Sequence, residues 1–187
     1  MKKHLNITKV CQILFMILTI AIMVTIFVLS AEDAEESSDT SSTLTKAAVV
    51  IIDRNYYQEP PVKQQEIWHK ASFIVRKLAH FSIYAALGFC ASITAGKRRL
   101  FTLKSLRVIA FGFLYAVSDE FHQSFSAGRS CEFRDMMIDT GGVTAGMLVS
   151  LVFMGIIAFL VRKRQKAVEL RAKMKRRPRR SRQTKSP

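Results

Sequence analysis

The sequence is poor in the residues that build disulfide frameworks and metal knuckles. It has three cysteines among 187 residues, no two of them at a paired spacing. Two, Cys11 and Cys90, lie within apolar runs. This pattern excludes a disulfide-stabilised scaffold and favours cysteines that pack as small apolar side chains. The sequence also lacks the H-E-x-x-H spacing of zinc peptidases.

Charge is absent from long stretches of the chain. Residues 10–29 contain no charged side chain, and three further apolar runs cover 73–95, 106–121 and 136–161. About 20 apolar residues in a helix cross the hydrocarbon core of a bilayer. The first run is longer than the roughly 7–15 residues of a signal-peptide core, so we expect it to be retained as an anchor. The sequence therefore predicts an all-α integral membrane protein, a four-helix bundle.

Acidic residues are scarce in the residues before the first run, in the connection 97–107 and in the tail 162–187. The tail holds thirteen Lys or Arg residues and a single Glu. Segments 31–70 and 118–139 instead hold eight and five acidic residues. By the positive-inside rule, both termini are predicted to be cytoplasmic. We therefore attribute the formal net charge of +15 to topology and to contact with anionic membrane lipids, and expect no nucleic-acid partner.

These boundaries divide the chain into four parts. We expect an N-terminal transmembrane helix over 1–30, an extracytoplasmic loop rich in acidic, Ser and Thr residues over 31–70, a three-helix membrane core over 71–161, and a basic cytoplasmic tail over 162–187. The expected location is the cell membrane, crossed four times.

Ionisable and polar residues gather at the same predicted end of three apolar runs. Within each run they are three or four residues apart, which places them near one another on a helical face. The groups are Lys77, His80 and Tyr84; Tyr115, Asp119 and His122; and Asp135 and Asp139. Ionisable groups at membrane depth are costly unless they face protein, water or a ligand. We therefore predict that three helices direct them to one extracytoplasmic site.

The residue types suggest roles within this predicted site. A histidine beside a carboxylate suits acid–base chemistry, and Lys or Arg side chains bind phosphate and carboxylate groups. The predicted acid–base residues are His80, His122, Asp119, Glu120 and Asp135. The predicted ligand-binding residues are Lys77, Tyr84, Gln123, Arg129 and Asp139.

Three functions fit this set. The first is an enzyme or binding site for an anionic headgroup of a lipid or a cell-wall precursor. The second is a metal site that combines His80 and His122 with one or two carboxylates, although no residue is assigned as a metal ligand from spacing alone. The third is a non-catalytic scaffold or small transporter, in which the polar residues form a structural ion-pair lock or a gate. The sequence specifies no cofactor.

Three motifs resemble the VanZ-like family of bacterial membrane proteins. They are KLAHFSIYAALG, SDEFHQSFSAGR and DMMIDTGGVTAG, in that order over roughly residues 70–155. The chain departs from the family at Ala127, where proline is common, and at Asp139, where asparagine is common. The resemblance implies a protein of the cell envelope. The namesake member is associated with low-level resistance to teicoplanin, so an influence on glycopeptide susceptibility is a further expectation.

Overall fold

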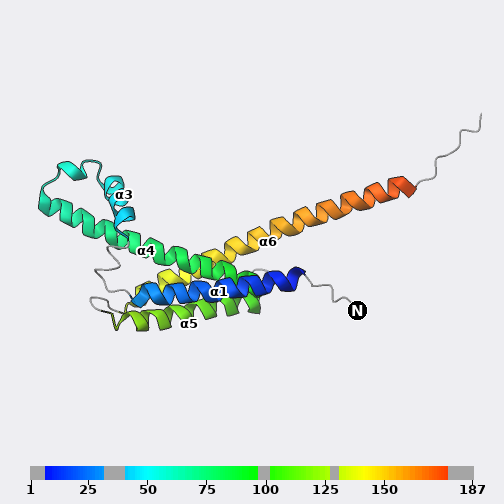
Figure 1. Cartoon of the computed structure of the whole chain (residues 1–187), viewed down its shortest axis with the longest axis horizontal. Helices are drawn as coiled ribbons and strands as arrows, with labels where there is room; N and C mark the ends of the chain where they lie inside the picture. Colours follow the sequence, from blue (N-terminus) through cyan, green and yellow to red (C-terminus); the bar gives the residue numbers. More distant parts are fainter. Residues whose placement is uncertain (1–6, 32–40, 97–101, 127–130, 177–187) are drawn as a thin grey trace, which may run out of the picture. The chain divides into compact units, whose positions relative to one another are not determined.

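A computed structural model describes residues 7–31, 41–96, 102–126 and 131–176, and every regular element within these ranges is a helix. The chain divides into two units, residues 1–151 and 152–187. The elements, shown in Figure 1, are α1 (Ile7–Ala31), α3 (Ser42–Ile52), the short 3₁₀ helix η1 (Tyr56–Gln58), α4 (Pro61–Thr94), α5 (Leu103–Gln123) and α6 (Phe133–Arg176). The prediction of an all-α protein is therefore confirmed for the described residues.

Three of these helices are long and apolar enough to cross a membrane. They are α1 over Lys9–Ala31, α4 over its full length and α6 over Phe133–Ala172. Helix α5 is not among them, because its 21 residues carry charges near both ends. The chain is thus a membrane protein, and three of the four predicted spans have helices of the required length and composition.

An apolar core joins α1, α4, α5 and the first part of α6. Its buried side chains come from all four helices: Ile26, Tyr84, Leu87, Val108, Ala116, Val143 and Met147. Polar contacts also tie α1 to its neighbours. Gln12 Nε2 donates to the Thr94 carbonyl oxygen at 3.3 Å, and the Tyr115 hydroxyl donates to the Met23 carbonyl oxygen at 2.6 Å. The core and these contacts hold the bundle that positions the polar residues.

Helices α4 and α6 run in parallel with a constant register. Lys77 bonds Asp135 near the start of this contact, and Ser92 bonds Ser150 near its end, each pair 58 residues apart in sequence. Between them the two backbones touch: a Cβ at Gly146 would collide with the Ala85 carbonyl group. Small residues at such positions let helices in membranes approach closely. The close approach therefore fixes which residues of α4 and α6 face one another.

A second, smaller cluster connects α3 to the first turns of α4. Val49 from α3 packs with Ile67 and Ala71 from α4, and Trp68 is partly buried against them. Helix α4 starts with Pro61 in its first turn, where a proline costs no hydrogen bond. The apolar patch in the loop that follows α1 thus forms a helix of its own.

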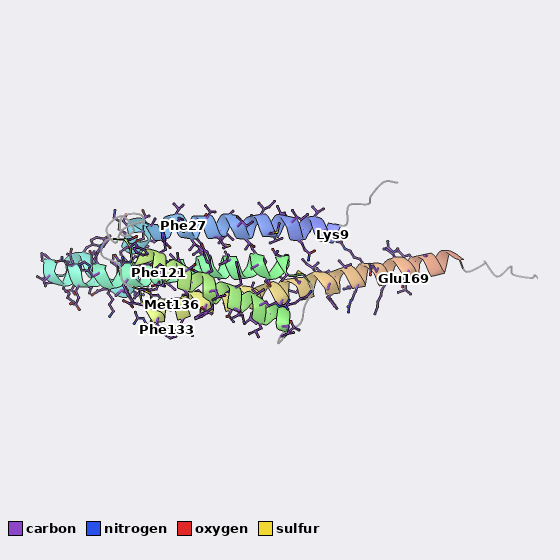
Figure 2. The ribbon with its side chains drawn as sticks, turned by 90° about the horizontal axis from the view of Figure 1, so that it is seen from below. Lys9, Phe27, Phe121, Phe133, Met136 and Glu169 are labelled. Carbon is purple, nitrogen blue, oxygen red and sulfur yellow. The ribbon has the colours of Figure 1, made fainter. Side chains whose placement is uncertain are left out.

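The ends of three helices meet at one end of the bundle. Figure 2 places Phe27 of α1, Phe121 of α5, and Phe133 and Met136 of α6 together, well separated from Lys9 at the other end of α1. The last turns of α1 and α5 and the first turns of α6 therefore share one end of the molecule.

Replacement of Gly146 by Ala tests the close contact of α4 and α6. The added methyl group would force the backbones apart, and overpacking of this kind costs about 1–3 kcal/mol of stability. Gly155→Ala is the matched control on the same helix, because nothing lies within 4 Å of a Cβ there. Thermal unfolding of the purified protein in detergent should show a lower midpoint for Gly146→Ala only. Equal midpoints for both variants would contradict the contact.

Candidate functional site

A cavity of about 250 Å³ opens between α4, α5 and the start of α6. Its lining residues are Phe73, Arg76, Lys77, His80, Glu120, Gln123, Glu132, Asp135, Ile138 and Asp139. Among them are two basic residues, four acidic residues and one histidine. The described lining is therefore strongly polar and carries more negative than positive groups.

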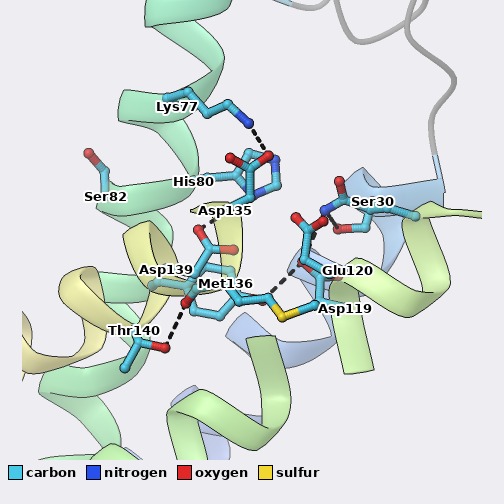
Figure 3. Close-up of polar contacts among 12 residues, drawn as sticks. Ser30, Lys77, His80, Ser82, Asp119, Glu120, Asp135, Met136, Asp139 and Thr140 are labelled. Carbon is cyan, nitrogen blue, oxygen red and sulfur yellow. Dashed lines mark hydrogen bonds and ion pairs between the residues drawn. The ribbon is translucent and has the colours of Figure 1, made fainter. Parts of the chain in front are cut away.

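Lys77 of α4 forms an ion pair with Asp135 of α6 at this cavity. Figure 3 shows the two side chains reaching toward each other from adjacent helices. The Lys77 ammonium also lies 5.2 Å from the centre of the Phe73 ring, within the range of a cation–π contact. Both partners are partly exposed, at 25% and 14% of their side-chain area. The pair is accessible from the open side of the cavity.

His80 and Asp139 face each other one turn further along the same two helices. His80 Nδ1 lies 3.9 Å from Asp139 Oδ1. Asp139 is buried, with 1% of its surface exposed, and its Oδ2 has no hydrogen-bond partner among the described residues. An unsatisfied buried carboxylate oxygen is costly, which makes Asp139 the residue of the cavity that most needs a ligand.

A hydrogen-bonded chain connects α4, α5 and α1 behind the cavity. The Tyr84 hydroxyl donates to Asp119 Oδ2 at 2.9 Å, and Gln123 Nε2 donates to the same oxygen at 3.1 Å. Gln123 Nε2 also lies 3.2 Å from the Ser30 hydroxyl at the end of α1. Tyr84 and Asp119 are almost fully buried. These contacts hold the Asp119 carboxylate in one orientation.

Glu120 is the second buried carboxylate in the cavity lining, after Asp139. Its Oε2 accepts a hydrogen bond from the Glu132 backbone N–H at 3.1 Å. Because Glu132 immediately precedes α6, this bond ties the end of α5 to the start of α6. Glu120 therefore has a structural contact in addition to its place in the cavity wall.

Three potential metal ligands from three helices converge at the buried side of this region. His80 of α4, Asp119 of α5 and Asp139 of α6 each place one donor atom within 4.8 Å of the other two. Figure 3 shows the three residues on their separate helices. Nitrogen and carboxylate oxygen together form a donor set that divalent transition metals accept.

His122 does not line the cavity that His80 lines. Its ring stacks on Phe27 of α1, with ring centres 4.1 Å apart and an angle of 15° between the planes. A step of three residues falls about 60° short of a full helical turn, so His122 faces α1 while Asp119 faces α4. Tyr115 likewise bonds to α1. Arg129, the other predicted ligand-binding residue on this side, lies outside the described residues.

The structure adds three polar residues to the predicted set. Arg76 and Glu132 line the cavity, and Ser30 contacts Gln123. Arg76 is adjacent to Lys77, and Glu132 lies three residues before Asp135, so each is a charged residue close in sequence to a predicted site residue. Nothing in the sequence near Ser30 indicated its role, because its contact joins residues 93 positions apart.

Replacement of Tyr84 by Phe tests the hydrogen-bonded chain. Loss of a hydrogen bond to a buried charged group should cost about 1.5–3 kcal/mol of stability, against about 0.5–1.5 kcal/mol for a bond to a neutral group. Tyr115→Phe is the matched control, because its hydroxyl bonds only a backbone carbonyl group. Denaturant unfolding in detergent should therefore rank Tyr84→Phe below Tyr115→Phe. The reverse order would show that the Asp119 contact adds no stability.

Comparison with known proteins supports the resemblance seen in the motifs. The model of the VanZ/LLP1 family matches residues 15–159, which is most of the chain and includes α1 from Phe15 onward, α3, α4, α5 and the cavity. Neither a curated protein nor a solved structure matches the chain. The family match confirms the assignment that the three motifs suggested.

Proposed function

The chain belongs to the VanZ/LLP1 family, and we propose that it is a four-span protein of the cell envelope whose cavity binds an anionic headgroup. The headgroup would belong to a membrane lipid or a lipid-linked cell-wall precursor on the extracytoplasmic side. One observation carries the proposal: Arg76, a half-buried arginine in the cavity wall, has no ion-pair partner among the described residues. Guanidinium groups bind phosphate and carboxylate groups through paired hydrogen bonds.

Both basic residues of the cavity lining lie on its more exposed side, where an entering ligand would reach them. Arg76 and Lys77 are partly exposed, whereas Glu120 and Asp139 are each 1% exposed. A headgroup that enters from the membrane surface would therefore meet Arg76 and Lys77, together with Asp135 and the exposed Glu132, before the buried carboxylates. Lys77 is already paired with Asp135, which leaves Arg76 as the principal anchor.

Helix α5 would provide the fourth span. Its 21 residues measure about 31 Å at 1.5 Å per residue, which matches the hydrocarbon thickness. Its charges lie near its ends, and the acidic ones, Asp119 and Glu120, are buried against other helices. Four spans would place both termini in the cytoplasm and the cavity at the extracytoplasmic end, in accord with the basic tail and the acidic loops.

Cysteine labelling tests this orientation. Cys131 is exposed and lies two residues before α6 at the cavity end, whereas Cys90 is buried. A membrane-impermeant maleimide added to intact cells should label the wild-type chain, and Cys131→Ser should remove the label. Labelling of Cys131 only in opened cells would reverse the proposed topology.

A structural ion-pair lock is the alternative function. The observation in its favour is the Lys77–Asp135 pair, which joins α4 to α6. In a lock, the polar groups fix the register of the helices and bind nothing. Arg76 separates the two functions, because it lines the cavity but takes no part in that pair.

Titration of the purified full chain with short-chain phospholipids tests the headgroup site. The wild type should bind phosphatidylglycerol more tightly than phosphatidylcholine. Arg76→Gln should weaken phosphatidylglycerol binding about tenfold, because it removes a charge-assisted hydrogen bond. Arg54→Gln is the matched control, since Arg54 is exposed and lies outside the cavity. The basic tail is present in all variants, so its contribution cancels.

Unchanged binding by Arg76→Gln would contradict the headgroup site. Exchange of the charges, Lys77→Asp combined with Asp135→Lys, completes the comparison. If the exchange restores the stability that Lys77→Asp or Asp135→Lys alone loses, and Arg76→Gln has no effect on lipid binding, the lock is established.

In cells, the proposal extends to glycopeptide susceptibility: Arg76→Gln should abolish any teicoplanin tolerance that the wild-type chain confers. Equal tolerance in both strains would remove this part of the proposal.

A further inference from the structure

We propose that His80, Asp119 and Asp139 bind one divalent transition-metal ion, and that this ion coordinates the anionic headgroup in the cavity. The role of the ion toward the headgroup rests on the proposed function, whereas binding of the ion itself does not. The juxtaposition of one imidazole and two carboxylates from three different helices carries the inference.

The geometry of the three donors suits a single ion. Their donor atoms lie within 4.8 Å of one another. Two ligands on one ion, at about 2.0–2.2 Å each, are separated by at most about 4.4 Å. Small side-chain rotations would therefore bring all three into coordination. Because each donor is held on a helix of the packed bundle, the backbone would not need to rearrange.

An unsatisfied atom at the same position points independently to a ligand. Asp139 Oδ2 is buried and has no hydrogen-bond partner among the described residues, and Asp139 lines the cavity. Burial of a carboxylate without a compensating charge costs several kcal/mol. Lys77, the lysine of the cavity lining, already pairs with Asp135. A bound cation would satisfy this oxygen and balance the buried negative charge.

The surroundings of Asp119 match the outer shell of a metal site. Tyr84 and Gln123 both donate hydrogen bonds to Asp119 Oδ2. Groups of this kind orient ligating carboxylates and raise the affinity of metal sites. They would therefore be positioning residues that present Asp119 to the ion.

The donor chemistry narrows the choice of ion. Imidazole favours zinc and other transition metals, and carboxylates also accept manganese and magnesium. One nitrogen and two oxygens together favour Zn²⁺ or Mn²⁺ over Mg²⁺. Three protein ligands leave at least one coordination position open. A phosphate or carboxylate oxygen of the headgroup could occupy it, with Arg76 contacting the same group from the more exposed side.

The ion also resolves a conflict of charge within the proposed function. The described cavity wall has four acidic residues and two basic ones, so on its own it would repel an anion. A divalent cation at the buried carboxylates reverses the sign of the local field, because bound metal ions are often the largest charges in a site. Binding of the headgroup and binding of the ion should then reinforce each other.

Metal binding to the purified full chain tests the site without any lipid ligand. The protein is freed of metal with EDTA and titrated with MnCl₂, and free Mn²⁺ is followed by electron paramagnetic resonance. We expect one Mn²⁺ per chain, displaced by ZnCl₂ but not by equimolar MgCl₂. His80→Gln and Asp139→Asn should each weaken binding by more than about tenfold, the lower bound known for outer-shell losses.

His69→Gln is the matched control for His80, because His69 is an exposed histidine on the same helix. This variant should bind Mn²⁺ as the wild type does. Near-UV circular dichroism reports whether each variant is folded. Failure of the folded wild type to bind either ion overturns the inference, as does wild-type affinity in both His80→Gln and Asp139→Asn. Metal binding by the wild type therefore tests the inference even where a variant does not fold.

Repetition of the phospholipid titration with EDTA or with added ZnCl₂ separates the two proposals. Tighter phosphatidylglycerol binding with the ion supports both. Phosphatidylglycerol binding that EDTA does not change would preserve the headgroup site and exclude the ion from it. Stoichiometric metal binding without selectivity for phosphatidylglycerol would preserve the metal site and exclude the headgroup.

Discussion

The constraint on which the rest of the structure depends is the burial of carboxylates inside a helical membrane bundle. Asp119, Glu120 and Asp139 are each at most 3% exposed. In such surroundings a carboxylate must be compensated by hydrogen bonds, a counter-charge or a ligand. Asp119 receives two side-chain hydrogen bonds and Glu120 a backbone one, whereas one oxygen of Asp139 receives none from the described residues. The helices are arranged so that their side chains and backbone groups supply these hydrogen bonds to the buried carboxylates.

The parallel packing of α4 and α6 provides the register for this compensation. The two helices approach so closely at Gly146 that a side chain would not fit, and the same offset relates Lys77 to Asp135 and Ser92 to Ser150. A shift of even one residue would turn these side chains about 100° away from their partners. Apolar packing and polar pairing therefore depend on each other, and neither fixes the site alone.

Much of the fold and part of the site could be predicted from local pattern. A charge-free run predicted α1 and a long apolar run predicted α6, and spacings of three and four placed Lys77 and His80 on one face of α4. The pairing of Lys77 with Asp135 needed the register of two distant helices, which periodicity does not contain. His122 does not lie beside His80 as the sequence predicted. It follows Asp119 by three residues, which turns its side chain toward Phe27 of α1.

The residue at position 139 links the charge of the cavity to its proposed ligand. Aspartate places a carboxyl group at a buried point of the cavity, beside His80 and near Asp119. A buried carboxylate without a compensating charge is destabilising, whereas one that holds a cation is favourable. Asp139 therefore supports the proposed metal site over a set of charges that only locks the helices together.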